Sequence, residues 1–147
     1  MIGTSVLHQT HLLIPQEDPS QNPEVALKLR EQECLSLLKK CKNMEEFKQT
    51  HAQFLKLGFF WNSFCASNLV ATCALSDWGS MDYACSIFPQ IDEPGSFEFN
   101  TMIRGHVKDM NFEEALLLYN EMIKRGVKPD KFTYPALLKD VFPFTIS

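Results

Sequence analysis

The stretch NFEEALLLYNEMIKRGVKPD, residues 111–130, has the pattern of a complete helix. Asn111 and Glu114 form a capping-box variant, in which the asparagine accepts from first-turn amides and the glutamate reaches back. Gly126 favours the left-handed conformation that ends helices, and Pro129 prevents continuation. The apolar residues in between recur at the spacing of one helix face: Phe112, Ala115, Leu116, Tyr119, Met122 and Ile123.

An earlier stretch, NMEEFKQTHAQFLKLG at residues 43–58, repeats this pattern. When Asn43 is placed on Asn111, the acidic cap residue, the apolar face, a C-terminal lysine and the closing glycine all coincide. The offset is twice a period of about 34 residues, which is typical of helix-turn-helix repeats. Because the caps and the apolar face coincide together, we interpret the chain as an array of helical repeats.

The remaining segments supply partner helices for this array. Residues 33–41 and 99–110 precede the two capped helices, residues 64–75 and 81–88 form a third pair, and residues 132–141 open a further first helix. No single repeat buries its apolar stripe alone, so neighbours must stack. The sequence therefore predicts an all-α, helical-hairpin repeat solenoid, a right-handed superhelix of about three helix pairs plus a terminal half-repeat. Its first helices should line one concave face.

Composition restricts the function. The 147-residue chain is 45% apolar, enough for a core, and its net charge of −4 argues against a broadly cationic surface for nucleic acid. No apolar run is long enough to cross a membrane. No nucleophile–base pair or ligand cluster is evident, so we expect no enzyme activity, no cofactor and no metal. Five cysteines without a C-x-x-C pair indicate small buried thiols: Cys34, Cys41, Cys65, Cys73 and Cys85.

The N-terminal segment carries only a weak targeting signal. Residues 1–16 lack acidic residues but also lack lysine and arginine, whereas transit peptides are arginine-rich. Residues 17–24, EDPSQNPE, have the composition of a flexible linker. We therefore interpret residues 1–30 as an N-terminal extension with a targeting or linker role.

The unit from Ser96 to Asp130 carries a distinctive set of residues at fixed places: Asn100, Thr101, Ile103, Gly105, Glu114, Ala115, Met122, Gly126, Pro129 and Asp130. It lacks the Trp-x-x-Leu-Gly-x-x-Tyr signature of tetratricopeptide repeats. On these residues the unit closely resembles a pentatricopeptide repeat, and it has that family's standard length.

The rest of the chain resembles the plant subclass with alternating long, standard and short repeats. The resemblance implies a long-type repeat at residues 31–62, a short-type repeat at 63–95, the standard repeat at 96–130, and a truncated repeat with a divergent tail at 131–147. Relatives often end in a cytidine-deaminase-like domain, whose His-x-Glu and Cys-x-x-Cys motifs are absent here. We therefore expect an N-terminal fragment or truncated product, with Pro143 breaking the last repeat. Its final helix would leave an uncovered apolar face formed by Tyr134, Leu137 and Leu138.

In such arrays each unit reads about one RNA base with two or three side chains. The resemblance implies that Asn100 reads the base edge, that Asp130 is its partner, and that Phe97 packs on the base plane, a combination that favours uracil. From the residues alone, Asn100 could instead bond its own helix start, Asp130 could be an N-cap, and Phe97 could be core. Arg104 and Lys108 are candidate phosphate contacts, against the alternative of solvated helix charges.

The other units are less complete. In the short-type repeat the corresponding residues are Phe64 and Ser67, but Gly95 offers no side chain in place of Asp130. The first unit has Leu35 with Asn62, and Leu35 cannot bond a base edge. Pro135 is equally unable to do so in the last unit. His51 and His106 lie on apolar faces and are expected to be packed histidines.

The resemblance implies a non-catalytic recognition module that binds single-stranded RNA sequence-selectively in organellar RNA processing or C-to-U editing. The location would be a plastid or mitochondrion. Binding would be weak with so few repeats, and RNA-editing factors or other repeat proteins are further candidate partners. The alternatives are a protein-interaction scaffold or a truncated product without function, and both are favoured by the acidic charge and the incomplete readers. The alternative to an organelle is a cytoplasmic location.

Overall fold

The computed structural model describes the backbone of residues 21–141 and the side chains up to Leu138. The predicted targeting segment, residues 1–16, and Pro143 lie outside these residues. Two units divide the chain, one ending at Cys34 and the other beginning at Leu35.

Helix α2 (Pro23–Lys40) begins earlier than the predicted first repeat at residue 31. Asn22 Oδ1 accepts hydrogen bonds from the amides of Glu24 at 3.0 Å and Val25 at 3.3 Å, which caps the helix start. A proline at the first helical position has the φ angle that a helix needs and lacks only an amide that would be unpaired there. The linker interpretation is therefore wrong for Pro23 and Glu24.

The second unit consists of helices and turns, and no strand occurs between residues 21 and 141. This confirms the predicted all-α, helical-hairpin repeat fold. Its elements are α3 (Met44–Lys56), η1 (Phe59–Trp61), α4 (Ser63–Leu75), α5 (Met81–Ile87), η2 (Phe88–Gln90), α6 (Ser96–Lys108), α7 (Phe112–Lys124) and α8 (Thr133–Val141).

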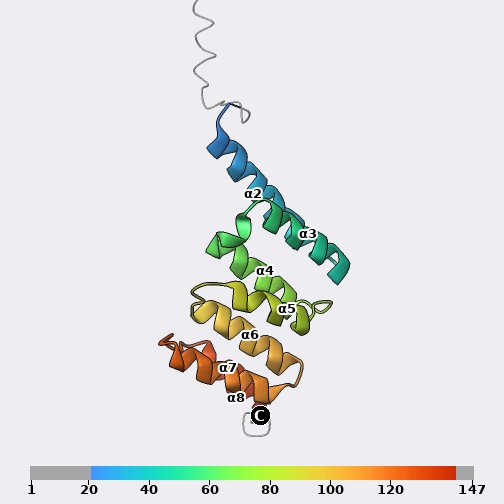
Figure 1. The fold of residues 1–147 in the computed structure, drawn as a ribbon. Coiled ribbons are helices and arrows are strands. Elements are labelled where there is room, and N and C mark those ends of the chain that lie inside the picture. The colour runs from blue at the N-terminus through green and yellow to red at the C-terminus, as the bar shows by residue number, and fades with distance from the viewer. Residues whose placement is uncertain (1–20, 142–147) are drawn as a thin grey trace, which may run out of the picture. The chain divides into compact units, whose positions relative to one another are not determined.

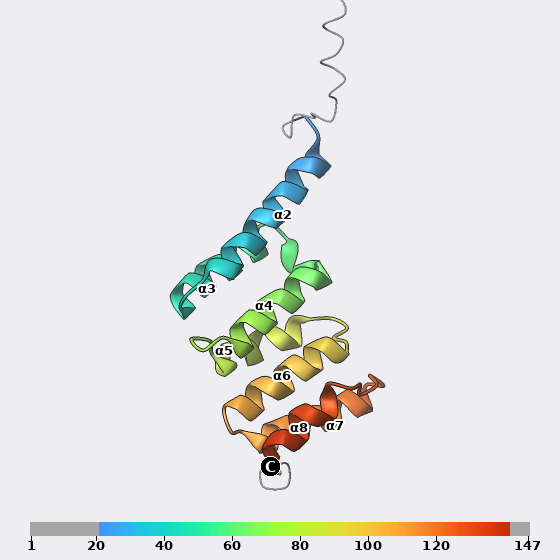
Figure 2. The ribbon, with the colours of Figure 1, turned by 180° about the vertical axis from the view of Figure 1, so that it is seen from behind.

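The first helices of consecutive repeats pack directly on one another. Helix α6 contacts α4 on one side and α8 on the other, while α5 packs on α4 and α7 packs on α6. Figures 1 and 2 show helices α4 to α8 stacked in chain order from opposite sides. The row formed by α4, α6 and α8 therefore brings equivalent positions of successive repeats next to one another.

The asparagine half of the predicted caps is confirmed, whereas the Glu46 carboxylate accepts from the Lys42 amide at 2.8 Å instead of the Asn43 amide. Asn43 Oδ1 accepts from the Glu46 amide at 2.8 Å, and Asn111 Oδ1 accepts from the Glu114 amide at 3.4 Å. These bonds satisfy amides that have no partner within the first helical turn. Each helix is followed by a glycine in the left-handed region: Gly58 at φ 79° and Gly126 at φ 76°.

The core under the last three helices includes Leu137, which was predicted to be uncovered. Leu137 is buried with Ile103, Val107 and Ala115, so that expectation is wrong for Leu137. Helix α8 turns this side chain toward α6 and α7. Two apolar side chains of α8 remain about half exposed: Tyr134 and Leu138.

Histidine and cysteine burial follows the apolar faces of the helices. His51 and His106 are buried, as expected, and four of the five free cysteines are buried as well. Cys85 is exposed, so the prediction of a buried thiol is wrong there. The buried side of α5 carries Ala84, and Cys85 is displaced from it by one residue, or about 100° around the helix.

Candidate nucleic-acid interface

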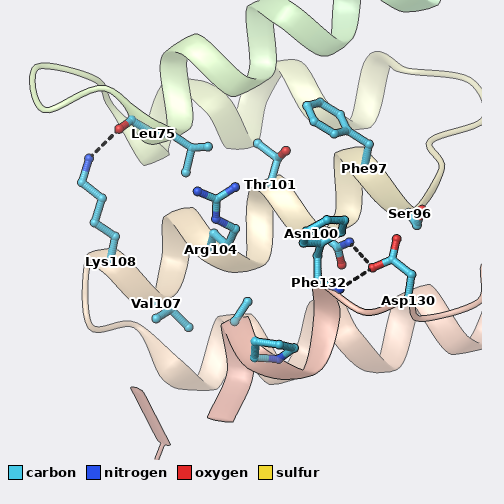
Figure 3. Close-up of a pocket in the computed structure, with 12 residues that line it drawn as sticks. Leu75, Ser96, Phe97, Asn100, Thr101, Arg104, Val107, Lys108, Asp130 and Phe132 are labelled. Atoms are coloured by element: carbon cyan, nitrogen blue, oxygen red, sulfur yellow. Dashed lines mark hydrogen bonds between the residues drawn. The ribbon is translucent and has the colours of Figure 1, made fainter. Parts of the chain in front are cut away.

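A pocket of about 930 Å³ lies between α6, α8 and the end of α4. Figure 3 shows its lining residues, which come from all three first helices and the segment before α8. All the residues expected to contact RNA in the standard repeat line this one pocket: Phe97, Asn100, Arg104, Lys108 and Asp130.

Helical periodicity explains why one side of α6 carries most of these residues. Phe97, Asn100, Thr101, Arg104 and Lys108 follow one another at intervals of three or four residues, which places them on one helix face. Other side chains of α6 are buried in the core and fix the helix in position: Phe99, Met102 and Ile103.

Asn100 and Asp130 meet although they are far apart in the sequence. Asn100 Nδ2 donates to Asp130 Oδ1 at 2.9 Å, and the Thr133 hydroxyl lies 2.7 Å from Asn100 Oδ1, to which it donates. The Asp130 amide donates in turn to Thr133 Oγ1 at 2.9 Å. These bonds join α6 to the start of α8, as the dashed line between Asn100 and Asp130 in Figure 3 illustrates in part.

The Asp130 carboxylate is held in its ionised form. Its pKa is lowered from the usual value mainly because the Phe132 amide donates to Oδ1 at 2.9 Å, with further hydrogen bonds from Asn100, Ser96 and Thr133. Hydrogen bonds to a charged group favour that form. The pocket therefore carries a fixed negative acceptor beside the Asn100 amide.

Burial and hydrogen bonds distinguish between the alternative structural roles of Asn100, Asp130 and Phe97. Asn100 is only 6% exposed and bonds Asp130 and Thr133 instead of its own helix start. Asp130 accepts from the Phe132 amide, so it does organise the turn that precedes α8. Phe97 is 55% exposed and is therefore no core residue. Asn100 is thus bound into the fold through its carbonyl oxygen and one of its two amide protons.

Two residues were not predicted from the sequence: Phe132, which lines the pocket, and Thr133, which bonds Asn100 without lining it. Phe132 is 61% exposed and lines the pocket, and it holds the same place in the last repeat as Phe97 does in the one before. Thr133 is fully buried and completes the Asn100 network. The Asp130-x-x-Thr133 pattern, in which a side chain bonds the amide three residues before it, was the available signal.

The two candidate phosphate contacts differ in their surroundings. Arg104 is exposed and lies within the pocket in Figure 3. Lys108 Nζ donates to the carbonyls of Leu75 and Ser76, each at 3.0 Å, and Asp77 Oδ1 lies 4.0 Å away. Lys108 therefore satisfies carbonyls at the C-terminal end of α4, whereas Arg104 has its charge available to a ligand.

The equivalent residues of the predicted short-type repeat are bonded differently. Ser67 Oγ donates to Glu98 Oε2, and the Gly95 amide donates to Glu98 Oε1 at 2.7 Å. Phe64, on the same face of α4, is 63% exposed. Pro135 lines the pocket between α6 and α8, and its side chain has no group that could form a hydrogen bond with a base.

The described part of the chain holds neither a metal cluster nor a membrane-spanning helix. No group of three or more histidine, cysteine or acidic residues is placed there to hold a metal ion. None of the helices between residues 21 and 141 combines the length and apolar character of a membrane span.

Comparisons with known proteins agree with the resemblance of residues 96–130. The model of the PPR repeat family matches residues 94–141, which contain α6, α7 and α8. The chain is 58% identical over 142 residues to pentatricopeptide repeat-containing protein At1g31920 of Arabidopsis thaliana, covering 95% of this chain and 23% of that protein.

Two further relatives from Arabidopsis thaliana have names that include an organelle. Pentatricopeptide repeat-containing protein At2g22410, mitochondrial, is 42% identical over 108 residues, which cover 71% of this chain and 16% of that protein. Pentatricopeptide repeat-containing protein At1g08070, chloroplastic, is 35% identical over 130 residues, or 88% and 17% of the two chains. The chain thus spans less than a quarter of the length of these three relatives.

Proposed function

Because the chain belongs to the pentatricopeptide repeat family, we propose that it binds single-stranded RNA through the pocket between α6 and α8. Proteins of this family generally bind RNA and act in organellar RNA processing. We assign residues 31–62, 63–95 and 96–130 to long, short and standard repeats, and α8 to the first helix of the next repeat.

One observation carries the proposal. Two exposed aromatic rings, Phe97 and Phe132, line the same pocket as the hydrogen-bonded pair of Asn100 and Asp130. Aromatic side chains stack on bases of any sequence, and each such contact contributes about 1–3 kcal/mol. The pocket thus combines a surface for the base plane with polar groups for the base edge.

The polar pair supports a preference for uracil. The second amide proton of Asn100 can donate to a uracil carbonyl, and the carboxylate of Asp130 can accept from the uracil N3–H. Cytosine presents an unprotonated N3 at that place, which the carboxylate would repel. Ser67 and Phe64 are assigned to the preceding base, and Arg104 to a phosphate.

The affinity of this chain alone should be low. Among the described residues, only the pocket around Asn100 combines exposed aromatic rings with an Asn–Asp pair, and association itself costs several kcal/mol. The net charge of −4 adds no general attraction for a polyanion. We expect a dissociation constant roughly in the high micromolar range.

In the cell, this binding would serve recognition without catalysis. We propose a role in organellar RNA processing, including C-to-U editing in which other factors perform the chemistry. The names of two relatives support a plastid or mitochondrial location. Other repeat proteins or RNA-editing factors are the partners that such a module would need.

The test is a fluorescence titration with ten-nucleotide strands of uridine or adenosine. The wild type should favour uridine at least about threefold, and Phe97→Ala should weaken binding about tenfold, equivalent to one stacking contact. Leu117→Ala is the matched control, because Leu117 is 54% exposed on α7 and does not line the pocket. Equal binding of the two strands, or a Phe97→Ala variant indistinguishable from wild type, would overturn the proposal.

A protein-interaction scaffold is the second candidate. Helix α7 exposes about half of three apolar side chains, Leu116, Leu117 and Ile123, and exposed apolar groups of this kind occur at protein interfaces. If the titration shows no RNA binding, these side chains become the first candidates for contact with another protein.

A further inference from the structure

The hydrogen bonds between repeats occur in the same arrangement at two successive junctions. The Asp130 amide donates to the Thr133 side chain, which bonds Asn100 of the preceding first helix. Likewise the Gly95 amide donates to the side chain of Glu98, which bonds Ser67. Glu98 therefore holds the place of Thr133, and Ser67 holds the place of Asn100.

The junction between α4 and α6 and the junction between α6 and α8 differ in which residue supplies a carboxylate. At the junction between α6 and α8 it is Asp130, and the neighbouring Thr133 is fully buried. At the earlier junction Gly95 has no side chain, and Glu98 brings a carboxylate that is longer than threonine and partly exposed. An acceptor is thus present at both junctions, although the sequence pattern indicated that the earlier one had lost it.

We propose that Glu98 is the base-reading acceptor of the short-type repeat, and that this site selects bases carrying an exocyclic amino group over uracil. The inference rests on the proposed RNA binding. Each Glu98 oxygen accepts one hydrogen bond from the protein and retains a lone pair for a second. The amino groups of cytosine, adenine and guanine are donors that suit this acceptor.

The available protons explain why uracil is disfavoured here and favoured at the next site. Asn100 has two amide protons and gives one to Asp130, so the other remains for a uracil carbonyl. Ser67 has a single hydroxyl proton, which it gives to Glu98. No donor from these two residues is left for the carbonyls of uracil. Uracil could therefore pair only its N3–H with Glu98 and would leave the flanking carbonyls unpaired beside a carboxylate.

The test compares three ten-nucleotide strands: uridine alone, alternating uridine and cytidine, and alternating uridine and adenosine. The alternating strands offer uridine to the pocket at Asn100 and an amino-bearing base to the neighbouring site. The wild type should bind the alternating strands at least about threefold more tightly than uridine alone, equivalent to one modest hydrogen bond. Glu98→Gln should remove or reverse this ratio, because it replaces one acceptor oxygen with a donor.

Two further variants make the result specific. Glu113→Gln removes the same charge from an exposed position on α7 and should leave the ratio unchanged. Ser67→Asn restores an amide donor and should shift the ratio toward uridine. Thermal unfolding of each variant is followed in parallel, because loss of the bonds between α4 and α6 alone would lower stability without changing the ratio.

The outcomes separate this inference from the proposed function. If no strand binds, the proposed function itself fails. If uridine strands bind but the ratios are the same for wild type, Glu98→Gln and Ser67→Asn, then Glu98 only joins two helices and the inference is overturned.

Discussion

The Asn100 side chain donates a hydrogen bond over 2.9 Å to Oδ1 of Asp130, which begins the turn that leads into the next first helix. The buried Thr133 hydroxyl holds the other end of the same amide at 2.7 Å. A polar pair assigned to base recognition therefore also ties one repeat to the next.

The first prediction concerns the stability of this junction. Thr133→Val keeps the shape of the side chain but leaves Asn100 Oδ1 and the Asp130 amide without their partner. Such a loss costs about 1–3 kcal/mol of unfolding free energy. Asn100→Ala should cost a similar amount, measured by urea unfolding followed by circular dichroism.

Asn120→Ala is the control for the junction, because Asn120 is exposed on α7. It should change the unfolding free energy by less than about 0.5 kcal/mol. If both Thr133→Val and Asn100→Ala leave the unfolding free energy unchanged, then the Asn100 side chain does not stabilise the junction between the repeats.

The second prediction compares two glycines. A Cβ added at Gly79 would lie 2.0 Å from the backbone carbonyl oxygen of Cys73, which cannot move aside without disrupting the turn after α4. A Cβ at Gly105 would lie 2.4 Å from Met81 Sδ, which belongs to a flexible side chain. Gly105→Ala should therefore cost about 1–3 kcal/mol.

Gly79→Ala should cost clearly more than Gly105→Ala, because its clash involves backbone. Alanine also gains up to about 1 kcal/mol over glycine within a helix, which favours only the Gly105 variant. Thermal unfolding of both variants checks the order, and equal loss would contradict it.

The sequence determined the local features well. Capping by Asn43 and Asn111 depends on residues within one helical turn, so the pattern alone predicted it. Pro23 was misinterpreted because proline both disrupts helices and starts them, and the composition of residues 17–24 suggested the former.

The parts of the candidate site that were missed depend on packing between repeats. Lys108 bonds carbonyls of α4, and Glu98 bonds Ser67, in each case more than 30 residues earlier in the chain. The periodicity predicted which helix face these residues share. The periodicity did not predict which residues Lys108 and Glu98 bond, because these partners depend on how far one helix is shifted along its neighbour.

The third prediction concerns acid sensitivity. Burial lowers the pKa of His51 below its usual 6.5, and its buried Nε2 has no hydrogen-bond partner among the described residues. The unfolded chain therefore binds a proton more readily than the folded one. The stability contribution of neutral His51 is fully present above about pH 6.5 and is lost as the pH falls through the lowered pKa.

His51→Phe should reduce this loss of stability between pH 7.5 and 5.5, because phenylalanine fills the ring volume without titrating. Urea midpoints at several pH values provide the measurement. His106 is the comparison, since burial lowers its pKa while Glu114 and Asp109 oppose the shift. An acid dependence that is the same in wild type and His51→Phe would assign the effect to other groups.

The fourth prediction separates Arg104 from Lys108. Both lie on the pocket face of α6, but Lys108 already bonds the carbonyls of Leu75 and Ser76. Arg104→Gln should therefore weaken the binding of a ten-nucleotide uridine strand. It should also reduce the slope of log affinity against log salt by about 0.7, the contribution of one phosphate contact to a single strand.

Lys108→Gln should leave the salt slope unchanged and lower the unfolding free energy by about 0.5 kcal/mol, because a cation at the end of α4 is lost. Its distance of 4.0 Å to the fully exposed Asp77 adds little to this value. Lys124→Gln removes an equal charge from the exposed face of α7 and should change neither quantity strongly. If Lys108→Gln reduces the salt slope as much as Arg104→Gln, the lysine leaves α4 when RNA binds, and the distinction between the two cations is wrong.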